Sequence, residues 1–475
     1  MKINKIISFL LIALLIVSCV DDLQETNLNP NEAQVAQPEY LLSNAIKSSV
    51  DTYWGTTNNL DGTLLFAQHV AKIQYTEIDR YIASTTTFES PWKSFYSQGL
   101  RDLNEVIKIG ENENSPNYKA VATIFRSWIF LLLTDAYGDI PYSEAIDIDN
   151  HITPAYDAQQ DVYYGLLDEL KSAAALLDPA QKAVTGDLIY SGNLTRWKKF
   201  AHSLRYRIAL RIADRAPEKA RQTILEIPVA ELIGSGDIAQ LVYLTSPNQN
   251  PIALFFETRD DYRVSKSIVE TLKSLNDPRL PIFANKTESA TPEVYIGVPN
   301  GLTNSGASAL GFSKTSKLGS YFTTPQTPAV IISPAEVLFA RAEAAARGFT
   351  AEDAASLYNQ AITASLNQFG ISNSATITAY LAQPAVQYNP ANFRQSIGVQ
   401  KWIALFGQGL EAFAEWRRLD YPQLLPAVAG TLDGKMPVRY LYPGSEQSLN
   451  AKSYKAAVAR QGTDALITKL WFDIN

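Results

Sequence analysis

Apolar residues recur every three or four positions along several long segments of the chain, which is the pattern of amphipathic helices. In the clearest of these segments, which begins at Ser115-Pro116, one face carries Val121, Ile124, Phe125, Trp128 and Leu132. The same periodicity predicts helices at residues 39–50, 157–177, 193–214, 334–347 and 351–369. Ser333-Pro334 also marks a helix start, because proline tolerates the first helical position. The chain is therefore predicted to be mainly α-helical, with its helices in pairs.

One long segment, residues 283–328, lacks this periodicity. It is rich in Gly, Pro, Ser, Thr and Asn, and it carries Tyr295 and Tyr321. A loop region of that length inside a compact domain is uncommon and often functional. We therefore expect a single domain over residues 39–475, in which a scaffold of helix pairs carries a loop-rich insert at about 283–328.

The N-terminus has the pattern of a lipoprotein signal. Lys2 and Lys5 precede a run of twelve residues, 6–17, that is apolar except for Ser8. This run is shorter than the ~20 residues that a membrane-spanning helix needs, so residues 1–18 are predicted to be a signal peptide. Cys19 would then be the first mature residue and would carry the lipid, since two or more acyl chains anchor a protein stably. Residues 19–38 are polar and are expected to form a flexible tether.

Charge and cysteine content exclude several functions. The formal net charge is −7 and there is no basic block, which argues against nucleic acid as a partner. Cys19 is the only cysteine, so no disulfide can form within the chain and no thiol remains for catalysis.

No motif for catalysis is present, so we expect a protein that is not an enzyme. The three histidines, His69, His151 and His202, lie far apart and show no zinc-site spacing. Glu411 and Glu415 share a helical face, which admits the acid pair of a glycosidase. The arginines that follow them favour a structural role instead, because arginine forks onto carboxylates.

We expect no cofactor, although calcium is left open. Asp147, Asp149 and Asn150 resemble a loose calcium loop, but their spacing is not that of an EF-hand. A solvated turn is the favoured interpretation.

Aromatic residues in polar, loop-like stretches are candidates for ligand binding, because an exposed ring can stack against the apolar face of a sugar. The same surface suits a peptide, and for any one residue ordinary packing is an equally good explanation. With one neighbouring arginine, the candidate ligand-binding residues are Trp54, Tyr75, Tyr81, Tyr262, Arg263, Tyr295 and Tyr321.

Several motifs, in a fixed order behind the predicted lipidation site, carry a family resemblance. The stretch from Thr134 to Ala145 reads TDAYGDIPYSEA, and RWKKF, NDPRL and EWRR follow at residues 196–200, 276–280 and 415–418. In this order they resemble the SusD/RagB family of outer-membrane nutrient-binding lipoproteins, and the chain is most similar to its SusD-like branch.

This resemblance implies a fold and a function. The fold would be SusD-like and mainly α, with four tetratricopeptide-like helix pairs packed against a loop-rich region with minor β structure. The protein would sit on the cell surface at the outer membrane, held by its lipid, and Asp21-Asp22 is similar to the acidic export signal of such lipoproteins. It would pass an oligosaccharide to a SusC-like TonB-dependent transporter. Capture of a peptide, as in RagB-like proteins, is the alternative, and a hydrolase or a purely structural adaptor of the transporter are weaker ones.

Overall fold

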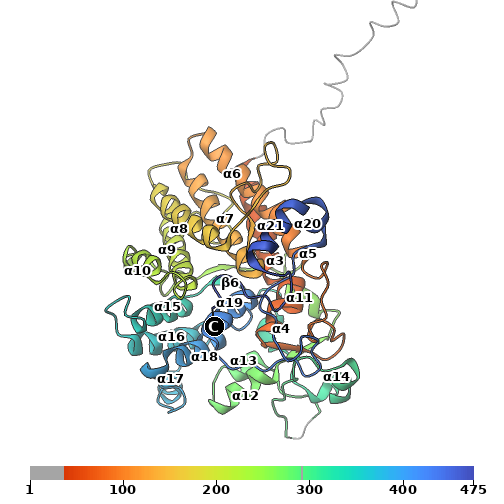
Figure 1. Ribbon diagram of the computed structural model, residues 1–475. Helices are drawn as coiled ribbons and strands as arrows, with labels where there is room; N and C mark the ends of the chain where they lie inside the picture. Colours follow the sequence, from red (N-terminus) through yellow and green to blue (C-terminus); the bar gives the residue numbers. More distant parts are fainter. Residues whose placement is uncertain (1–36, 290–291, 475) are drawn as a thin grey trace, which may run out of the picture.

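The computed structural model describes residues 37–289 and 292–474, which form a mainly helical fold (Figure 1). The predicted signal peptide, Cys19 and all but the last two residues of the predicted tether lie outside the described residues. The first described helix, α3 (Pro38–Trp54), begins one residue before the expected start of the domain.

Four helix pairs form the scaffold that the sequence predicted, and in Figure 1 they occupy the left and centre of the view. The pairs are α6 (Arg101–Asn112) with α7 (Pro116–Tyr137), α8 (Gln159–Leu176) with α9 (Leu194–Arg211), α15 (Pro334–Ala346) with α16 (Ala354–Gln368), and α18 (Phe393–Ala404) with α19 (Gly409–Leu419). Two shorter helices, α10 (Pro217–Leu225) and α17 (Ser374–Leu381), follow α9 and α16. The helices expected from the apolar periodicity are confirmed to within a few residues at each end.

Local side chains explain where these helices begin. Ser333 Oγ accepts a hydrogen bond from the Glu336 amide at 3.2 Å, and Pro334 occupies the first turn of α15. Asp353 caps α16 by accepting from the Ala355 amide at 3.0 Å. Each of these side chains accepts a hydrogen bond from a backbone amide in the first turn, which has no carbonyl partner within the helix. One such cap stabilises a helix by about 1 kcal/mol.

Shorter elements make up the rest of the described molecule, some packed on the helix pairs and most on the other side. The helical ones are η1 (Thr56–Thr63), α4 (Leu64–Phe66), α5 (Glu89–Ser94), η2 (Phe95–Leu100), η3 (Val229–Glu231), α11 (Pro251–Phe256), α12 (Lys266–Ser274), α13 (Leu280–Phe283), α14 (Asn304–Leu310), η4 (Phe312–Lys314), η5 (Ser320–Thr323), η6 (Pro390–Asn392), α20 (Gly444–Leu449) and α21 (Ala451–Gln461). Three antiparallel two-stranded ribbons join β1 (Val70–Lys72) to β5 (Tyr262–Val264), β2 (Ile140–Pro141) to β3 (Tyr156–Asp157), and β4 (Ala239–Leu241) to β6 (Ala329–Ile332).

The loop-rich insert is fixed to the β1–β5 ribbon by its backbone. The Val298 amide donates to the Val264 carbonyl at 3.0 Å, and the Val264 amide donates to the Ser316 carbonyl at 3.0 Å. Most of the insert lacks regular structure, as expected, but it also contains α14, η4 and η5. Because both sides of β5 are hydrogen-bonded, the loops around this ribbon have a rigid base.

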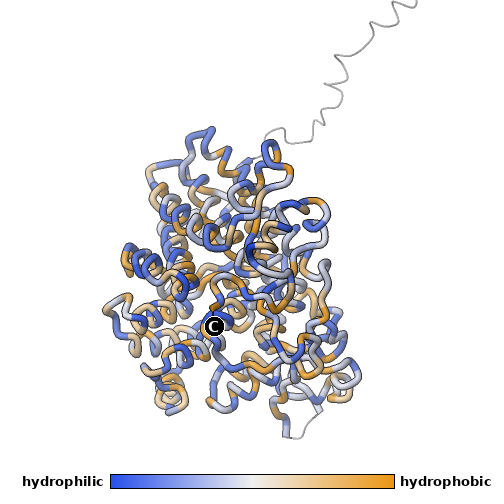
Figure 2. The backbone as a smooth tube through the Cα atoms, viewed as in Figure 1, coloured by the Kyte–Doolittle hydropathy of each residue, from blue (hydrophilic) through white to orange (hydrophobic). Residues whose placement is uncertain are grey.

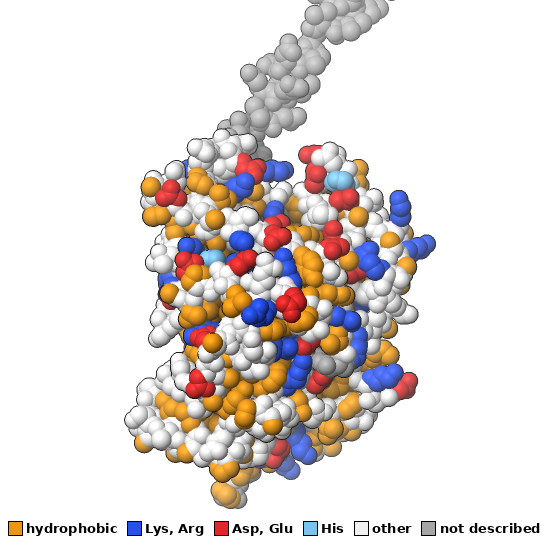
Figure 3. Space-filling model, turned by 60° about the vertical axis from the view of Figure 1, so that its left-hand side comes forward, with side chains coloured by type: hydrophobic (Ala, Val, Ile, Leu, Met, Phe, Trp, Pro, Cys, Tyr) orange, Lys and Arg blue, Asp and Glu red, His pale blue; other side chains and the backbone are white. Residues whose placement is uncertain are grey.

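A hydrophobic core runs through both sides of the molecule, and the apolar segments of Figure 2 lie mainly inside it. Among the described residues α7 alone is long and apolar enough to cross a membrane, yet 89% of its most apolar window is buried inside the protein. This helix is therefore a core helix. On the face shown in Figure 3, acidic and basic side chains are interspersed and no continuous basic area appears.

A buried ion network joins α19 to the helices around it. The Arg211 guanidinium of α9 lies 3.2 Å from the Asp135 carboxylate of α7 and 2.8 Å from the Glu411 carboxylate of α19. Glu415, one turn further along α19, lies 2.7 Å from the Lys401 ammonium group of α18. All five side chains are buried. The network therefore links α7, α9, α18 and α19 through groups that water does not reach.

The interpretation of Glu411 and Glu415 as structural residues is confirmed. Glu415 also pairs with Arg418, which forks onto Glu343 of α15. Burial alone would raise the pKa of Glu415, but Arg418, Lys401 and Arg211 hold it well below its usual range. Both carboxylates stay ionised within the network and are buried.

His69 links the β1–β5 ribbon to α18. It directly precedes β1, and its buried ring lies 5.1 Å from the Trp402 ring and 5.0 Å from the Phe406 ring, centre to centre. Its Nε2 is 3.1 Å from the Trp402 carbonyl oxygen and donates to it in the neutral tautomer. Burial lowers the pKa of His69 to about 3, so the ring is neutral at physiological pH.

Replacing Arg211 is expected to destabilise the fold strongly. Arg211→Ala leaves the buried carboxylates of Asp135 and Glu411 short of a counter-charge, which costs about 3–5 kcal/mol of unfolding free energy. Urea denaturation measures the change. The matched control is Arg221→Ala on the exposed face of α10, which is expected to shift the free energy by no more than about 0.5 kcal/mol. Equal stability of the two variants would contradict a structural role for the network.

The neutral His69 is expected to make the fold sensitive to acid. The unfolded chain binds a proton at this ring below a pKa of about 6.5, whereas the folded chain does so only near 3, so stability falls as the pH drops through this window. From pH 7 to pH 5 this group alone lowers the unfolding free energy by about 2 kcal/mol. Denaturation of His69→Gln across the same range should show a shallower loss than the wild-type chain. Parallel pH profiles would show that His69 does not carry the effect.

Candidate functional site

Trp54 and Tyr81 are buried, with 3% and 4% of their surface exposed. The expectation that these two rings face solvent is wrong, because tertiary packing covers them. Trp54 ends α3 beside Tyr53 and packs into the main core. The Tyr81 hydroxyl accepts a hydrogen bond from the Ala427 amide at 3.0 Å, so a distant segment closes over it. Neither ring offers a stacking face in this structure.

Tyr262 and Arg263 lie on β5 and are also fully buried. The Tyr262 ring packs 5.4 Å from the Phe255 ring, and the Lys72 ammonium group lies 4.4 Å above its centre. Arg263 donates to the Asp260 carboxylate at 2.7 Å and lies 5.3 Å from the Phe312 ring centre. The expectation of an exposed Tyr262 ring is therefore wrong, and both side chains support the loops above the ribbon.

Tyr75 is the candidate whose ring does face solvent, with 56% of its surface exposed. The guanidinium of Arg259 stacks on it, 5.2 Å from the ring centre. Arg259 in turn forks onto the Asp261 carboxylate, and this hydrogen bonding raises the pKa of Arg259, which stays charged. Gln74 also donates to Asp261, at 2.6 Å. A polar network therefore holds an aromatic face and a cation together at the surface.

The backbone at Tyr75 is strained, which marks the position as unusual. Its φ is 54°, in the left-handed region that few residues other than glycine adopt. The turn is held on both sides, because the Ile73 amide donates to the Asp261 carbonyl at 2.9 Å and the Thr76 amide donates to Asn304 at 3.0 Å. Strain that persists under such constraints is typical of functional positions.

Arg259 also lines a cavity of about 520 Å³, which we call the loop pocket. The pocket lies between α11, residues 257–260 and the insert, and its lining includes Phe256, Glu257, Thr258, Arg259, Asp260, Asn285, Lys317 and Thr323. The Lys317 ammonium group lies 2.9 Å from Glu288 and 3.6 Å from Asp260, so this cation is paired with carboxylates. The loop pocket offers an apolar wall, an amide and charged hydrogen-bonding groups beside the Tyr75 ring. That combination suits a polar ligand with apolar faces.

The last two candidates lie in the insert and are half-buried. Tyr295 lies between the exposed Val294 and Ile296, and Tyr321 lies in η5, where it lines a different cavity. The structure therefore brings Tyr75, Tyr262 and Arg263 together around the β1–β5 ribbon, and it places Trp54 and Tyr321 elsewhere. Sequence reasoning missed Arg259, although its place in a charged stretch next to Asp260-Asp261 was a usable signal.

Within residues 37–289 and 292–474, no group of three or more histidine, cysteine or acidic side chains is arranged to hold a metal ion. The turn that resembles a calcium loop is closed by its own side chains. Asn150 donates to both carboxylate oxygens of Asp147 at 3.0 Å, and the turn is exposed.

Comparison with known proteins places this geometry in a family. Residues 30–443 match the SusD-like family model that is described as starch-binding and associating with the outer membrane. A solved chitin-binding protein is 29% identical, with a TM-score of 0.84 over 92% of this chain and 100% of its own. A SusD homolog from Bacteroides uniformis is 27% identical, with a TM-score of 0.82 over 92% of this chain and 100% of its own.

A third structure shares the fold. It is a chitin-binding SusD homolog from Flavobacterium johnsoniae, 23% identical, with a TM-score of 0.83 over 91% of this chain and 99% of its own. No protein of curated function matches the chain significantly.

Proposed function

The chain belongs to the SusD-like family of starch-binding, outer-membrane-associated proteins, and on that premise we propose that it is a cell-surface lipoprotein that captures an oligosaccharide. It hands the oligosaccharide to a SusC-like TonB-dependent transporter in the outer membrane. Lipid on Cys19 holds it at the surface, with residues 19–38 as the tether. It binds its ligand without changing it chemically.

The observation that carries this proposal is the exposed Tyr75 ring with Arg259 stacked on it, beside the loop pocket. A sugar ring has apolar C–H faces and a rim of hydroxyls. The face of the Tyr75 ring can stack on the apolar C–H face of the sugar. The side chains of Arg259, Asn285 and Thr258 can hydrogen-bond to its hydroxyls. Binding of this kind needs only a held geometry, and the supported ribbon supplies it.

The carboxylates of the described site fit a binding role better than a catalytic one. Asp260 is paired with Arg263, and Glu257 accepts a hydrogen bond from Gln249. Asp261 is buried against Arg259 and Gln74. A glycosidase needs one carboxyl group that gives a proton and a second that acts as nucleophile or base. These carboxylates are engaged as hydrogen-bond acceptors, so we propose that they position the side chains that touch the ligand.

Chito-oligosaccharides are the first ligands to test, because a solved relative that aligns over its full length is a chitin-binding protein. The acetamido group of such a sugar has an N–H donor, a carbonyl acceptor and a methyl group. The loop pocket offers a carboxylate, an amide and the Phe256 ring for these three groups.

Removing the ring or the cation is expected to weaken saccharide binding. Tyr75→Ala and Arg259→Ala should each lower the affinity for chitohexaose or maltohexaose about tenfold, a loss of about 1.4 kcal/mol of binding free energy. Calorimetric titration of the chain from residue 20 onward measures this. Tyr40→Ala is the matched control, because Tyr40 is also an exposed tyrosine and lies at the start of α3.

Three results of this titration would count against the proposal. If Tyr75→Ala binds saccharide with unchanged affinity, the Tyr75 ring and the loop pocket are not the binding site. If the wild-type chain binds none of the saccharides tested, saccharide capture itself is overturned. If it binds mixed oligopeptides and no saccharide, the protein is reassigned to peptide uptake.

Surface anchoring is expected to depend on Cys19. Cys19→Ser removes the thiol that would receive the lipid, so the variant should lose incorporation of labelled palmitate and should leave the outer-membrane fraction. Ser18→Ala keeps the thiol beside another small residue and should behave as the wild type. Membrane retention of Cys19→Ser would refute lipid anchoring.

A further inference from the structure

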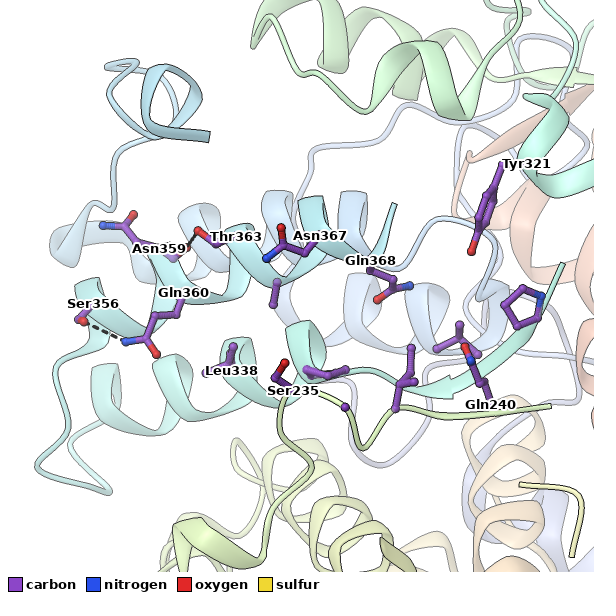
Figure 4. Close-up of a pocket in the computed structure, with 16 residues that line it drawn as sticks. Ser235, Gln240, Tyr321, Leu338, Ser356, Asn359, Gln360, Thr363, Asn367 and Gln368 are labelled. Atoms are coloured by element: carbon purple, nitrogen blue, oxygen red, sulfur yellow. Dashed lines mark hydrogen bonds between the residues drawn. The ribbon is translucent and has the colours of Figure 1, made fainter. Parts of the chain in front are cut away.

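A second cavity, of about 810 Å³, lies between α16, α15 and the β4–β6 ribbon (Figure 4). We call it the amide groove, because Asn359, Gln360, Asn367 and Gln368 of α16 line one wall, with Gln240 of β4 across from them. Asn359, Thr363 and Asn367 are spaced four residues apart, so they share one face of the helix. Each step of four residues advances about 6 Å along the axis, which makes the wall an elongated row of hydrogen-bonding groups.

The amide groove is uncharged. None of the 16 residues that line it is Asp, Glu, Lys, Arg or His. A charged ligand would give up hydration there without meeting a counter-charge, which is costly. The groove therefore suits a neutral ligand.

One acceptor in this wall lacks a partner. Gln368 Oε1 is buried and accepts no hydrogen bond from any described residue. Figure 4 shows the Gln368 side chain at the end of the row of amides, towards Tyr321. A buried acceptor left unsatisfied costs about 1–3 kcal/mol, so this position favours a ligand that brings an O–H or N–H donor.

The remaining lining has the mixed character of a saccharide site. Amide and hydroxyl side chains each donate and accept, as sugar hydroxyls do. Leu338, Val330 and the Tyr321 ring supply apolar surface for the C–H faces of a sugar. A row of groups that both donate and accept matches a chain of hydroxyls more closely than the fixed donors and acceptors of a peptide backbone.

The amide groove and the loop pocket are each lined by one residue of η5. Tyr321 of η5 lines the groove, and Thr323 of the same turn lines the loop pocket. These residues are about 4 Å apart along the turn at the 2.0 Å rise of a 3₁₀ helix. Ser320 and Thr324, which flank them, are exposed and polar. The turn η5 therefore connects the linings of the two cavities and presents polar side chains to a chain that passes between them.

We propose that the amide groove is a second saccharide subsite, which binds the continuation of an uncharged oligosaccharide whose first units lie in the loop pocket. The inference rests on the proposed function, which it deepens by adding selection for chain length. Short oligosaccharides occupy the loop pocket alone. Longer ones cross η5 and gain the amide row.

The test compares two ligand lengths in two sets of variants. Chitotriose with chitohexaose, and maltotriose with maltohexaose, are titrated calorimetrically into the chain from residue 20 onward. The wild type should bind a hexaose about tenfold more tightly than the matching triose. The double variant Asn359→Ala, Asn367→Ala should bind the hexaose only as tightly as the triose, with the triose unchanged. Both positions are exposed, so folding should be preserved, and Gln222→Ala on α10 is a matched control for removing an exposed helical amide.

The outcomes separate this proposal from the proposed function. Full hexaose affinity in the double variant would overturn the second subsite while leaving saccharide capture intact, and equal weakening of triose and hexaose would also overturn it. Absence of binding by any of the four sugars in the wild type would overturn both proposals. Hydrogen exchange gives an independent readout, because hexaose but not triose should slow exchange in α16. Protection of α16 by a neutral oligopeptide instead would overturn the saccharide assignment.

Discussion

The fold depends on a cluster of charges that has been taken out of water. Arg211 contacts carboxylates from α7 and α19, and Arg418 joins α19 to α15. Each of these groups would be costly to bury alone, so the helices that carry them are stable only when all are in place. This interdependence fixes how the helix pairs meet. The loops at the other side of the molecule are free of that constraint, and the loop pocket is built there.

The β1–β5 ribbon transmits this rigidity to the loops. Tyr262 and Arg263 are buried in β5, while Tyr75 and Arg259, which lie in the chain just beyond the ends of β1 and β5, are exposed. His69 ties the ribbon to α18, and the insert pairs with β5. A site that combines exposed side chains with a buried, hydrogen-bonded base keeps its geometry without a ligand, which reduces the entropy lost on binding.

The sequence predicted the helical scaffold, but it predicted only part of the candidate site. Helices such as α7 and α16 follow from apolar periodicity and from caps, which are local properties, and Glu415 was recognised as structural from the arginines beside it. Whether a single aromatic ring is exposed depends instead on which distant segments pack against it. Trp54 and Tyr81 lie in polar stretches, yet segments more than 300 residues away in the chain, at Gly407 and Ala427, close over them. Asn359 and Asn367 could not be identified as site residues from the sequence, because polar residues on a helix usually mark its solvent-facing side. They line a cavity only because β4 and β6 lie close to this face of α16 in the folded chain.

The contrast in charge between the two cavities has a consequence for the conditions in which the protein works. The loop pocket holds Lys317 with ion pairs that are exposed to solvent, and dissolved salt screens such pairs over a Debye length of about 8 Å at physiological ionic strength. The amide groove contains no formal charge, so its contacts are indifferent to salt. As the ionic strength of the surroundings rises, the balance of binding would shift from the first cavity towards the second. A cell that meets fluctuating salinity would then hold long chains more evenly than short ones.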